Sequence, residues 1–269
     1  MIDPTVPRRA VALVTGASEG IGAELARVFA AHGHDLALVA RRRDRLEVLA
    51  DEIAAAGRPR PLVVALDLAR PDAADALANA LDAAGVVPAF LVNNAGFGAL
   101  GAAAAIEPAT QLGVIDLNVR ALTALTLRFL PAIVHAKGGV LNVASMAAFL
   151  PGPGMAVYYA SKAYVLSFSE SLAQELKASG VRVSALCPGL VLTGFQARAG
   201  IERGPLHSRM LALMSARQTA EAGYRGLMAG RRVVVPGAIQ TVMARILPFI
   251  PRAILLPQVA AMQKRRNAQ

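Results

Sequence analysis

The sequence alternates short apolar runs with longer segments of helical periodicity, and this alternation limits the fold more than any other feature. The apolar runs, which we interpret as strands, are residues 10–15, 35–40, 62–66, 90–92, 139–143, 181–186 and 233–235. The helical segments between them are residues 20–32, 44–56, 71–84, 108–136 and 155–179. Repeated units of strand, helix and strand build a parallel sheet with helices on both faces. We therefore expect an α/β fold with a doubly wound parallel sheet of seven strands.

The chain has the size and composition of one ordered domain. Its 269 residues are 55% hydrophobic and 17% charged, which excludes a disordered chain. We expect a single domain over residues 1–269, with a core at residues 8–237, a helical lid at residues 190–220 and a C-terminal extension at residues 238–269. The single cysteine, Cys187, cannot form an internal disulfide, and the N-terminus lacks the features of a signal peptide. These features predict a cytoplasmic protein.

The positive charge is concentrated near the C-terminus. The formal net charge is +10, and residues 222–269 contain eight arginines and lysines but no acidic residue. Nucleic acid binding is not expected, because only Tyr224 and Phe249 are aromatic there and no recognition motif accompanies the charge. The four histidines show no metal-ligand spacing with carboxylates or thiols, so no metal is predicted.

A glycine-rich turn follows the first predicted strand directly. The spacing Gly16-x-x-x-Gly20-x-Gly22 joins that strand to the first predicted helix. Glycines let the backbone approach a pyrophosphate closely, and the N-terminus of the following helix favours its negative charge. We interpret this segment as the dinucleotide-binding turn of a Rossmann-type sheet.

The end of the second predicted strand indicates which dinucleotide binds. NAD sites usually place an acid here for the ribose 2′-hydroxyl, but this chain has Ala40 followed by Arg41. An arginine suits a 2′-phosphate, although the charge of Glu19 in the glycine turn weighs against one. The alternative is that the arginines at 41–43 only solvate the start of a helix. We expect NADP(H) rather than NAD(H) as the cofactor.

Tyr158 and Lys162 lie one predicted helical turn apart and form the candidate catalytic pair. Residues i and i+4 share a helix face, so the ammonium can favour the ionised phenol. Ser145 follows the predicted strand at 139–143, at the edge of the sheet where ligands bind in α/β folds. These groups predict proton transfer to or from an alcohol or carbonyl oxygen, coupled to hydride transfer from a cofactor. Tyr159 has the wrong spacing to Lys162, and we expect it to be a packing residue.

Together these motifs resemble the classical short-chain dehydrogenase/reductase family over residues 8–195, and the ending after Val235 resembles the DltE-like branch of that family. The positions that match the catalytic residues of the family are Asn118, Ser145, Tyr158 and Lys162. The positions that match its cofactor-binding residues are Gly16, Ser18, Glu19, Gly20, Ile21, Gly22, Arg41, Asp67, Leu68, Asn94, Ala95, Gly96, Tyr158, Lys162, Pro188, Gly189, Val191 and Thr193. The resemblance implies a homodimer or homotetramer, assembled through the two long helices that contain Asn118 and Tyr158.

The resemblance also implies a role for each catalytic residue. Tyr158 exchanges a proton with the substrate oxygen, while Lys162 lowers the tyrosine pKa from its free value of about 10 and holds the nicotinamide ribose. Ser145 hydrogen-bonds the substrate oxygen where charge develops. Asn118 holds a water that links Lys162 to bulk solvent.

The residues expected around the substrate are mostly apolar. They are Phe97, Met146, Phe149, Leu150, Met155, Leu190, Phe195, Leu206, Met210 and Met214. We therefore expect an NADP(H)-dependent oxidoreductase that interconverts a carbonyl and a secondary alcohol on a hydrophobic substrate. Two alternatives remain: a 3-oxoacyl-thioester reductase acting on carrier-protein or CoA substrates, and a non-catalytic NADP-binding regulator. Residues 194–208 contain glycines and little periodicity, so we expect a flap that closes after the cofactor binds.

The C-terminal extension carries an apolar run that Arg245, Arg252 and several prolines interrupt, which argues against a membrane-spanning helix. We favour a tail that packs on its own subunit or a neighbour and helps to cover the substrate pocket. The alternative is peripheral contact with an anionic membrane surface through this basic, apolar segment.

Overall fold

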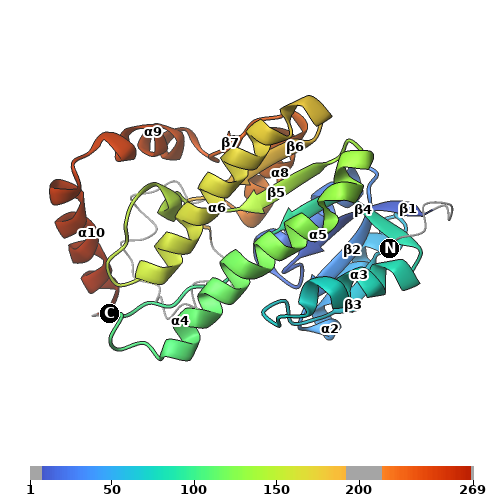
Figure 1. The fold of residues 1–269 in the computed structure, drawn as a ribbon, viewed down its shortest axis with the longest axis horizontal. Helices are drawn as coiled ribbons and strands as arrows, with labels where there is room; N and C mark the ends of the chain where they lie inside the picture. The colour runs from blue at the N-terminus through green and yellow to red at the C-terminus, as the bar shows by residue number, and fades with distance from the viewer. Residues whose placement is uncertain (1–7, 192–213, 268–269) are drawn as a thin grey trace.

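The computed structural model describes residues 8–191 and 214–267, in which seven parallel strands form one sheet (Figure 1). The strands are β1 Arg9–Thr15, β2 Asp35–Ala40, β3 Leu62–Ala65, β4 Val86–Asn93, β5 Gly139–Val143, β6 Arg182–Leu186 and β7 Val233–Val234. Their order is β3-β2-β1-β4-β5-β6-β7, so the chain reverses its winding direction between β1 and β4. This reversal is the switch point of a doubly wound sheet, and the predicted fold class is confirmed.

Strand β4 is longer than the sequence pattern indicated, because it begins at Val86 rather than at residue 90. Its first residues, up to Pro88, pair with the start of β1, and the register then shifts between Val11 and Ala12. Proline has no backbone donor and usually interrupts strand patterns, which is why this part of the strand was missed.

The helices are α1 Gly20–Ala31, α2 Arg43–Ala55, α3 Ala73–Ala83, α4 Pro108–Ile115, α5 Leu122–His135, α6 Ala156–Glu175, α8 Ala216–Met228, α9 Ala238–Ile246 and α10 Arg252–Asn267. Helices α1 to α6 fall where helical periodicity predicted them, within one or two residues at most ends, whereas α8, α9 and α10 were not among the predicted helical segments. Shorter helical turns are η1 Asp116–Ala121, which is a π-helix, and the 3-10 turns η2 Met146–Phe149, η3 Lys177–Ser179 and η5 Leu247–Phe249.

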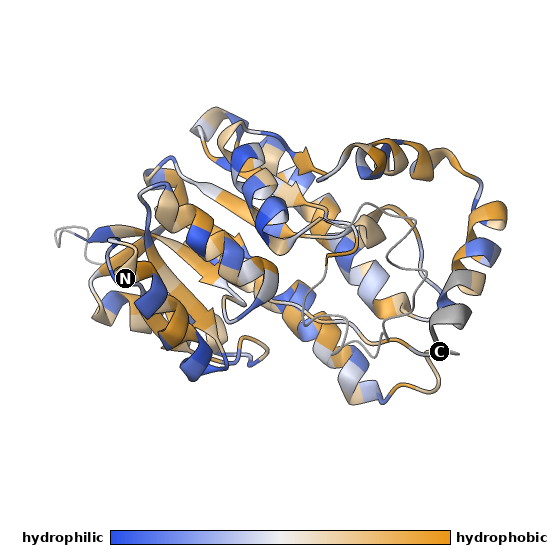
Figure 2. Ribbon diagram, turned by 180° about the vertical axis from the view of Figure 1, so that it is seen from behind, coloured by the Kyte–Doolittle hydropathy of each residue, from blue (hydrophilic) through white to orange (hydrophobic). Residues whose placement is uncertain are grey.

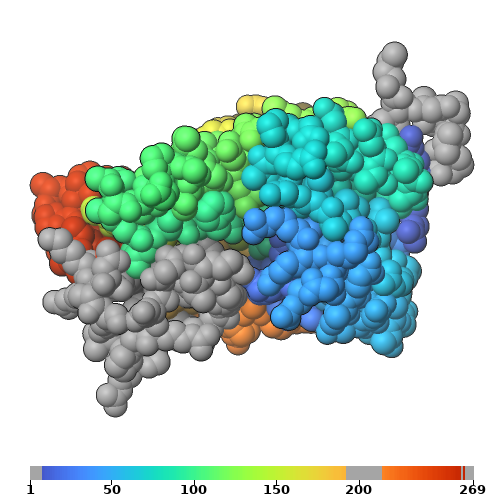
Figure 3. Space-filling model, turned by 90° about the horizontal axis from the view of Figure 1, so that it is seen from below, coloured from blue at the N-terminus to red at the C-terminus, as the bar shows by residue number. Residues whose placement is uncertain are grey.

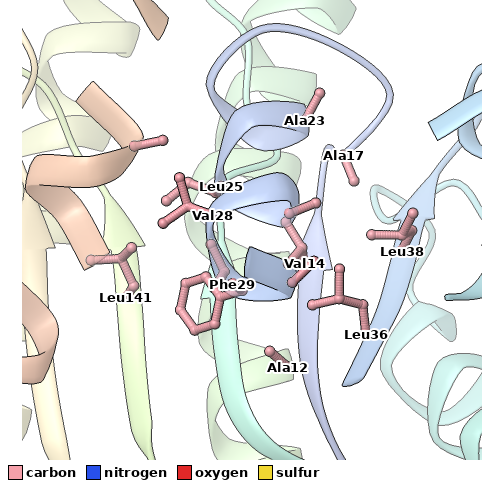
Figure 4. Packing of buried hydrophobic residues seen from close by; sticks show 14 of the residues in the cluster. Ala12, Val14, Ala17, Ala23, Leu25, Val28, Phe29, Leu36, Leu38 and Leu141 are labelled. Carbon is pink, nitrogen blue, oxygen red and sulfur yellow. The ribbon is translucent and has the colours of Figure 1, made fainter. Parts of the chain in front are cut away.

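The strands are apolar on both faces because helices cover both. Helices α1, α2 and α8 pack on one face, where Phe29 and Leu25 of α1 lie against Val14 of β1 (Figure 4). Helices α3, α5 and α6 pack on the other face, against alternate strand residues such as Val11 and Leu13. Alternation along β1 thus sends successive side chains into two separate cores.

A buried polar network joins the middle of the sheet to the helices. The Asn93 side-chain amide of β4 donates hydrogen bonds to Thr126 of α5, at 3.0 Å, and to Asn142 of β5, at 2.9 Å. Asn142 in turn donates to the Ser169 hydroxyl of α6 at 2.9 Å. Buried polar groups of this kind are costly unless they are paired, so the network fixes how β4, β5 and the two helices meet.

Residues 108–135 form one continuous helix through α4, η1 and α5, which is long and apolar enough to cross a membrane by length and composition. This helix instead packs on the sheet, with Phe129 and Ile133 in the core. Figure 3 shows α5 beside α3, and Arg128 of α5 pairs with Asp75 of α3 at 3.2 Å. It is therefore a core helix of the fold.

Candidate active site

The glycine turn is shaped to receive a phosphate group. Gly16 and Gly20 have φ values of +64° and +59°, in a backbone region that residues with side chains rarely adopt. A Cβ atom on Gly22 would collide with the Asn94 side chain and with the Gly16 carbonyl. Helix α1 begins directly at Gly20, so its N-terminal backbone donors open onto the turn. The turn therefore fits the pyrophosphate of a dinucleotide.

Asn94 ties the glycine turn to the end of β4. Its side-chain amide donates to the carbonyl oxygens of Thr15, at 3.0 Å, and Gly16, at 3.1 Å. The Thr15 hydroxyl accepts hydrogen bonds from the backbone of Asn94 and Ala95. These contacts lie at the switch point of the sheet, so the two strands that meet there hold the turn in a fixed place.

One large cavity, of about 1110 Å³, runs from the glycine turn along the carboxyl edge of the sheet. Most predicted site residues line it, namely Gly16, Ser18, Glu19, Gly20, Ile21, Arg41, Asp67, Leu68, Asn94, Ala95, Gly96, Ser145, Tyr158, Lys162, Pro188, Gly189 and Val191. Gly22 and Asn118 are not part of its wall, although both contact residues that are. Thr193 lies outside the described residues. The predicted cofactor and catalytic residues thus converge on one space.

The structure adds Arg42 to the cofactor end of the cavity, a residue that the sequence analysis left out. Its guanidinium donates to the Ser18 hydroxyl at 3.0 Å and pairs with the Glu19 carboxylate at 2.9 Å. The Glu19 charge, which weighed against a 2′-phosphate, is therefore balanced by an arginine. Arg41 lines the same end of the cavity. The sequence shows three arginines at residues 41–43, but only the structure shows that Arg42 contacts the glycine turn.

Tyr158, Lys162 and Ser145 meet halfway along the cavity. The buried Lys162 ammonium lies 5.8 Å from the centroid of the Tyr158 ring and donates to the Val143 carbonyl at 2.8 Å. Ser145 caps η2 by accepting a hydrogen bond from the Ala147 amide at 3.1 Å, and its hydroxyl also hydrogen-bonds the Tyr158 phenol. A substrate oxygen placed beside Ser145 and Tyr158 would face two hydroxyl donors.

Burial dominates the protonation of the catalytic pair. Burial raises the pKa of Tyr158 to about 12, although the hydrogen bond with Ser145 acts in the opposite direction. Burial also lowers the pKa of Lys162 to about 8. The prediction that Lys162 lowers the tyrosine pKa is therefore wrong for this structure. The physical reason is that removing the phenolate from water raises the pKa more than the other effects lower it. The Lys162 ammonium, in turn, donates its hydrogen bond to the Val143 carbonyl.

Asn118 lies behind the cavity wall, in the π-helical turn η1. Its side-chain amide donates to the Phe97 carbonyl at 2.9 Å and to the Ser161 hydroxyl at 3.0 Å, and its oxygen accepts from the Phe97 amide. A Cβ atom on Gly96 would stand 2.9 Å from the Asn118 oxygen and 3.5 Å from the Lys162 nitrogen. Asn118 therefore fixes the segment after β4 against α6, directly beside Lys162.

The far half of the cavity is apolar, as predicted. Some of the residues that form its wall were not in the predicted set. From the predicted set, Phe97, Met146, Leu150, Met155 and Leu190 line it. Phe149 packs behind the wall, Met214 forms a β-bridge with Val191, and Phe195, Leu206, Met210 and the segment 194–208 lie outside the described residues. A large further part of the wall comes from the C-terminal extension, through Gln240, Met243, Leu247, Ile250, Leu255, Gln258 and Val259.

The C-terminal extension is fastened to the protein beside the catalytic pair. The Gln263 side-chain amide donates to the Tyr159 hydroxyl at 3.1 Å, and both side chains are buried. Leu247, Leu255 and Val259 form an apolar cluster with residues around η2. The predicted packing of the tail on its own subunit is confirmed, as is the packing role of Tyr159.

Comparison with known proteins places the chain in a family. The short chain dehydrogenase family profile matches residues 10–203. Sulfoacetaldehyde reductase from Chromohalobacter salexigens is 39% identical over 185 residues, which cover 68% of this chain and 72% of that protein. An uncharacterized oxidoreductase from Myxococcus xanthus is 36% identical over 242 residues, 88% of this chain and 92% of the other. A short chain dehydrogenase from Pseudocercospora fijiensis is 39% identical over 185 residues, and the match spans 59% of its length.

Solved structures agree with this assignment. A short-chain dehydrogenase from Sphingobium yanoikuyae in complex with NADPH superposes with a TM-score of 0.76 at 32% identity, over 91% of this chain and 97% of that chain. A bulky-bulky ketone specific alcohol dehydrogenase from Comamonas testosteroni gives a TM-score of 0.72 at 27% identity, over 92% and 96%. A short chain dehydrogenase/reductase from Burkholderia phymatum in complex with NAD superposes with a TM-score of 0.77 at 26% identity. The match covers 90% of this chain and 93% of that chain.

The matched segment, residues 10–203, contains the glycine turn, Ser145, Tyr158 and Lys162. These comparisons favour an enzyme over a non-catalytic regulator, and a nicotinamide cofactor over any other. The chain therefore belongs to the classical short-chain dehydrogenase/reductase family and is an oxidoreductase that acts on CH–OH donors.

Proposed function

We propose that this protein interconverts a hydrophobic ketone and its secondary alcohol with NADP(H). The observation that carries the proposal is the single cavity with two unlike ends. Arg41 and Arg42 stand at one end, apolar residues of the C-terminal extension form the other, and Ser145 and Tyr158 lie between them. Such a cavity can hold a charged dinucleotide and a lipophilic carbonyl compound with the catalytic hydroxyls at their junction.

The protein's own groups supply the proton and stabilise the developing charge. The bound nicotinamide would supply the hydride. Because burial raises the pKa of Tyr158 to about 12, the phenol keeps its proton at neutral pH and can donate it to a carbonyl oxygen as a general acid. Ser145 donates a second hydrogen bond to the same oxygen, where negative charge develops. This protonation state suits reduction at neutral pH.

The preference for NADP(H) rests on charge at the end of β2. Arg41 follows Ala40, where NAD sites usually carry an acid, and Arg42 balances Glu19. A 2′-phosphate at this position would meet guanidinium groups, which bind phosphate strongly and in a directed way. The related structures include complexes with both NADPH and NAD, so the arginines of this chain carry the argument.

We also propose a homo-oligomer assembled through the long helices. Leu112 and Ile115 of α4, Leu127 of α5 and Tyr164 of α6 are large apolar residues exposed on these helices. Tyr164 hydrogen-bonds Thr123 of α5 at 2.8 Å, so the exposed side chains are held in place. A second copy would remove this apolar surface from water.

A 3-oxoacyl thioester remains the alternative substrate, because an acyl chain would also fit the apolar half of the cavity. A panel of ketones and 3-oxoacyl thioesters, assayed by NADPH oxidation, separates the two. Turnover of thioesters with little turnover of ketones would support the alternative.

Replacing Tyr158 with phenylalanine should remove the proton donor while leaving the shape of the cavity. We expect Tyr158→Phe to lower kcat about 10²-fold to 10⁴-fold, with NADPH affinity little changed. Tyr164→Phe, an exposed tyrosine on the same helix, is the matched control and should be as active as the wild type. A Tyr158→Phe enzyme with normal kcat would rule out the assigned acid.

Replacing Arg41 with alanine should weaken the enzyme selectively toward NADPH. We expect kcat/KM for NADPH to fall about tenfold or more in Arg41→Ala, with kcat/KM for NADH little changed, because only NADPH carries the phosphate. Arg43→Ala is the control, since the Arg43 side chain pairs with Glu47 on α2. Equal losses with both cofactors would contradict the NADP assignment.

Enlarging the buried residue Leu255 should reduce the space for bulky substrates. We expect Leu255→Phe to raise KM for a bulky ketone about tenfold or more, while KM for acetone changes little. Leu255 is 5% exposed and lines the cavity, whereas its neighbour Leu256 is 37% exposed, so Leu256→Phe is the control. An unchanged preference in Leu255→Phe would place the substrate elsewhere.

The buried ammonium of Lys162 should cost stability at neutral pH. Its pKa of about 8 lies below the ordinary lysine value of 10.5, so the unfolded state holds the proton more tightly and the cost is fully present below pH 8. Lys162→Met should therefore raise the free energy of unfolding at pH 7 by about 1 to 3 kcal/mol, after allowing for the lost bond to Val143. The gain should disappear near pH 10.5, as measured by urea unfolding.

The exposed Lys177 provides the control for this experiment, because Lys177→Met should change stability little at either pH. A Lys162→Met protein that is less stable than the wild type at pH 7, or that gains stability only at high pH, would contradict the predicted cost of burial.

A further inference from the structure

Helix α9 turns its apolar face outward. Ile239, Val242, Met243 and Ile246 are exposed, and their spacing of three and four residues places them on one helix face. The buried positions, which face the protein, are Gln240, Ala244 and Leu247. A surface helix of a globular protein usually has the opposite arrangement, with its polar face outward.

The exposed apolar surface continues beyond α9. Phe249 of η5 is 86% exposed, and Ile254 and Leu256 of α10 are exposed as well. Of the twelve large hydrophobic residues exposed in the described part of the chain, seven lie within residues 239–256. Figure 2 shows hydrophobic residues prevailing along α9 and recurring in α10. Apolar surface gathered in this way marks an interaction site.

The same segment is positively charged. Arg245 and Arg252 are exposed, and neither makes an ion pair with another residue that the structure describes. The sequence after Glu221 contains no acidic residue and ends in further basic positions at 264–266. The exposed apolar residues are therefore interleaved in sequence with two exposed arginines, and their segment contains no carboxylate.

We propose that the outer face of α9, η5 and α10 rests on an anionic lipid bilayer. We call this surface, made of Ile239, Val242, Ile246, Phe249, Ile254 and Leu256, the outer tail face. Apolar residues interleaved with arginines are the composition of helices that lie at the interface of such membranes. Neither α9 nor α10 reaches the length of a membrane span, so the contact is peripheral.

A second copy of the chain fits this face less well. Two copies meeting here would bring two basic segments together, and neither segment contains an acidic residue that could pair with the other. An anionic bilayer supplies the missing negative charge and an apolar interior for Phe249.

The outer tail face also adjoins the cavity. Met243 is 40% exposed and also lines the cavity, and Gln258 of α10 is likewise exposed and part of the wall. A lipophilic ketone dissolved in the bilayer could therefore reach the cavity along this edge, an implication that rests on the proposed function. The surface itself is inferred from burial and charge alone.

The test is flotation of the full-length protein with lipid vesicles on a density gradient. We expect the wild type to float with vesicles containing phosphatidylglycerol and to remain unbound with pure phosphatidylcholine vesicles. Ile246→Asp and Phe249→Asp should lower the bound fraction about tenfold, because each places a carboxylate in the interface. Val48→Asp, which alters an equally exposed apolar residue on α2, should float like the wild type.

The inactive Tyr158→Phe variant should float as well as the wild type, so failure of the proposed activity and failure of the surface are distinguishable. Turnover of acetone by the two aspartate variants should be unchanged, since neither residue lines the cavity. The proposal is overturned if the wild type does not float, if it binds neutral vesicles equally, or if the aspartate variants float normally. It is also overturned if light scattering shows that these variants break up an oligomer, because a second copy would then cover the face.

Discussion

The hydrogen bonds at the end of β4 are the constraint on which the rest of the site depends. The Asn93 side chain hydrogen-bonds residues of β5 and α5. The side chain of the adjacent Asn94 hydrogen-bonds the backbone at the end of β1, on the other side of the switch point. Successive strand residues point to opposite sides, so two neighbouring asparagines can fasten different parts of the molecule. The glycine turn and the catalytic helix α6 are thereby held to the same strand, through Asn94 on one side and the Asn142–Ser169 contact on the other.

Burial shifts the pKa values of the candidate catalytic pair, Tyr158 and Lys162, and also makes the charged lysine costly to fold. The same low-polarity surroundings that keep the Tyr158 phenol protonated disfavour the Lys162 ammonium. Hydrogen bonds compensate in part, since the Val143 carbonyl accepts from the Lys162 ammonium and the Ser145 hydroxyl donates to the Tyr158 oxygen when it is ionised. Burying ionisable groups for proton transfer lowers the stability of the folded protein, which is the usual conflict between activity and stability.

Local sequence signals were enough for the strands, for helices α1 to α6 and for most of the residues that line the cavity. Glycine spacing, strand alternation and helical periodicity each depend on a few neighbouring residues, so they can be read without tertiary contacts. The errors involve interactions between distant segments. The pairing of Arg42 with Glu19 joins two loops, the start of β4 is concealed by Pro88, and the raised pKa of Tyr158 depends on everything packed around it. Family resemblance supplied the catalytic roles but not the protonation states.

The C-terminal extension shows why amphipathic patterns need a structure to be interpreted. In sequence its apolar residues are compatible with packing on the subunit or with contact outside it, and the structure shows one set packed on the subunit and another set exposed. Leu247, Leu255 and Val259 are buried against the protein, whereas Phe249 and Ile246 are largely exposed. A helix that is apolar on two sides must have two apolar neighbours, or it leaves hydrophobic surface in water at a cost of about 25 cal/mol per Å². The cavity and its surrounding cluster account for one side, and the other side is left exposed in the part of the chain that the structure describes, which is the surface that an anionic bilayer would cover in the proposal made above.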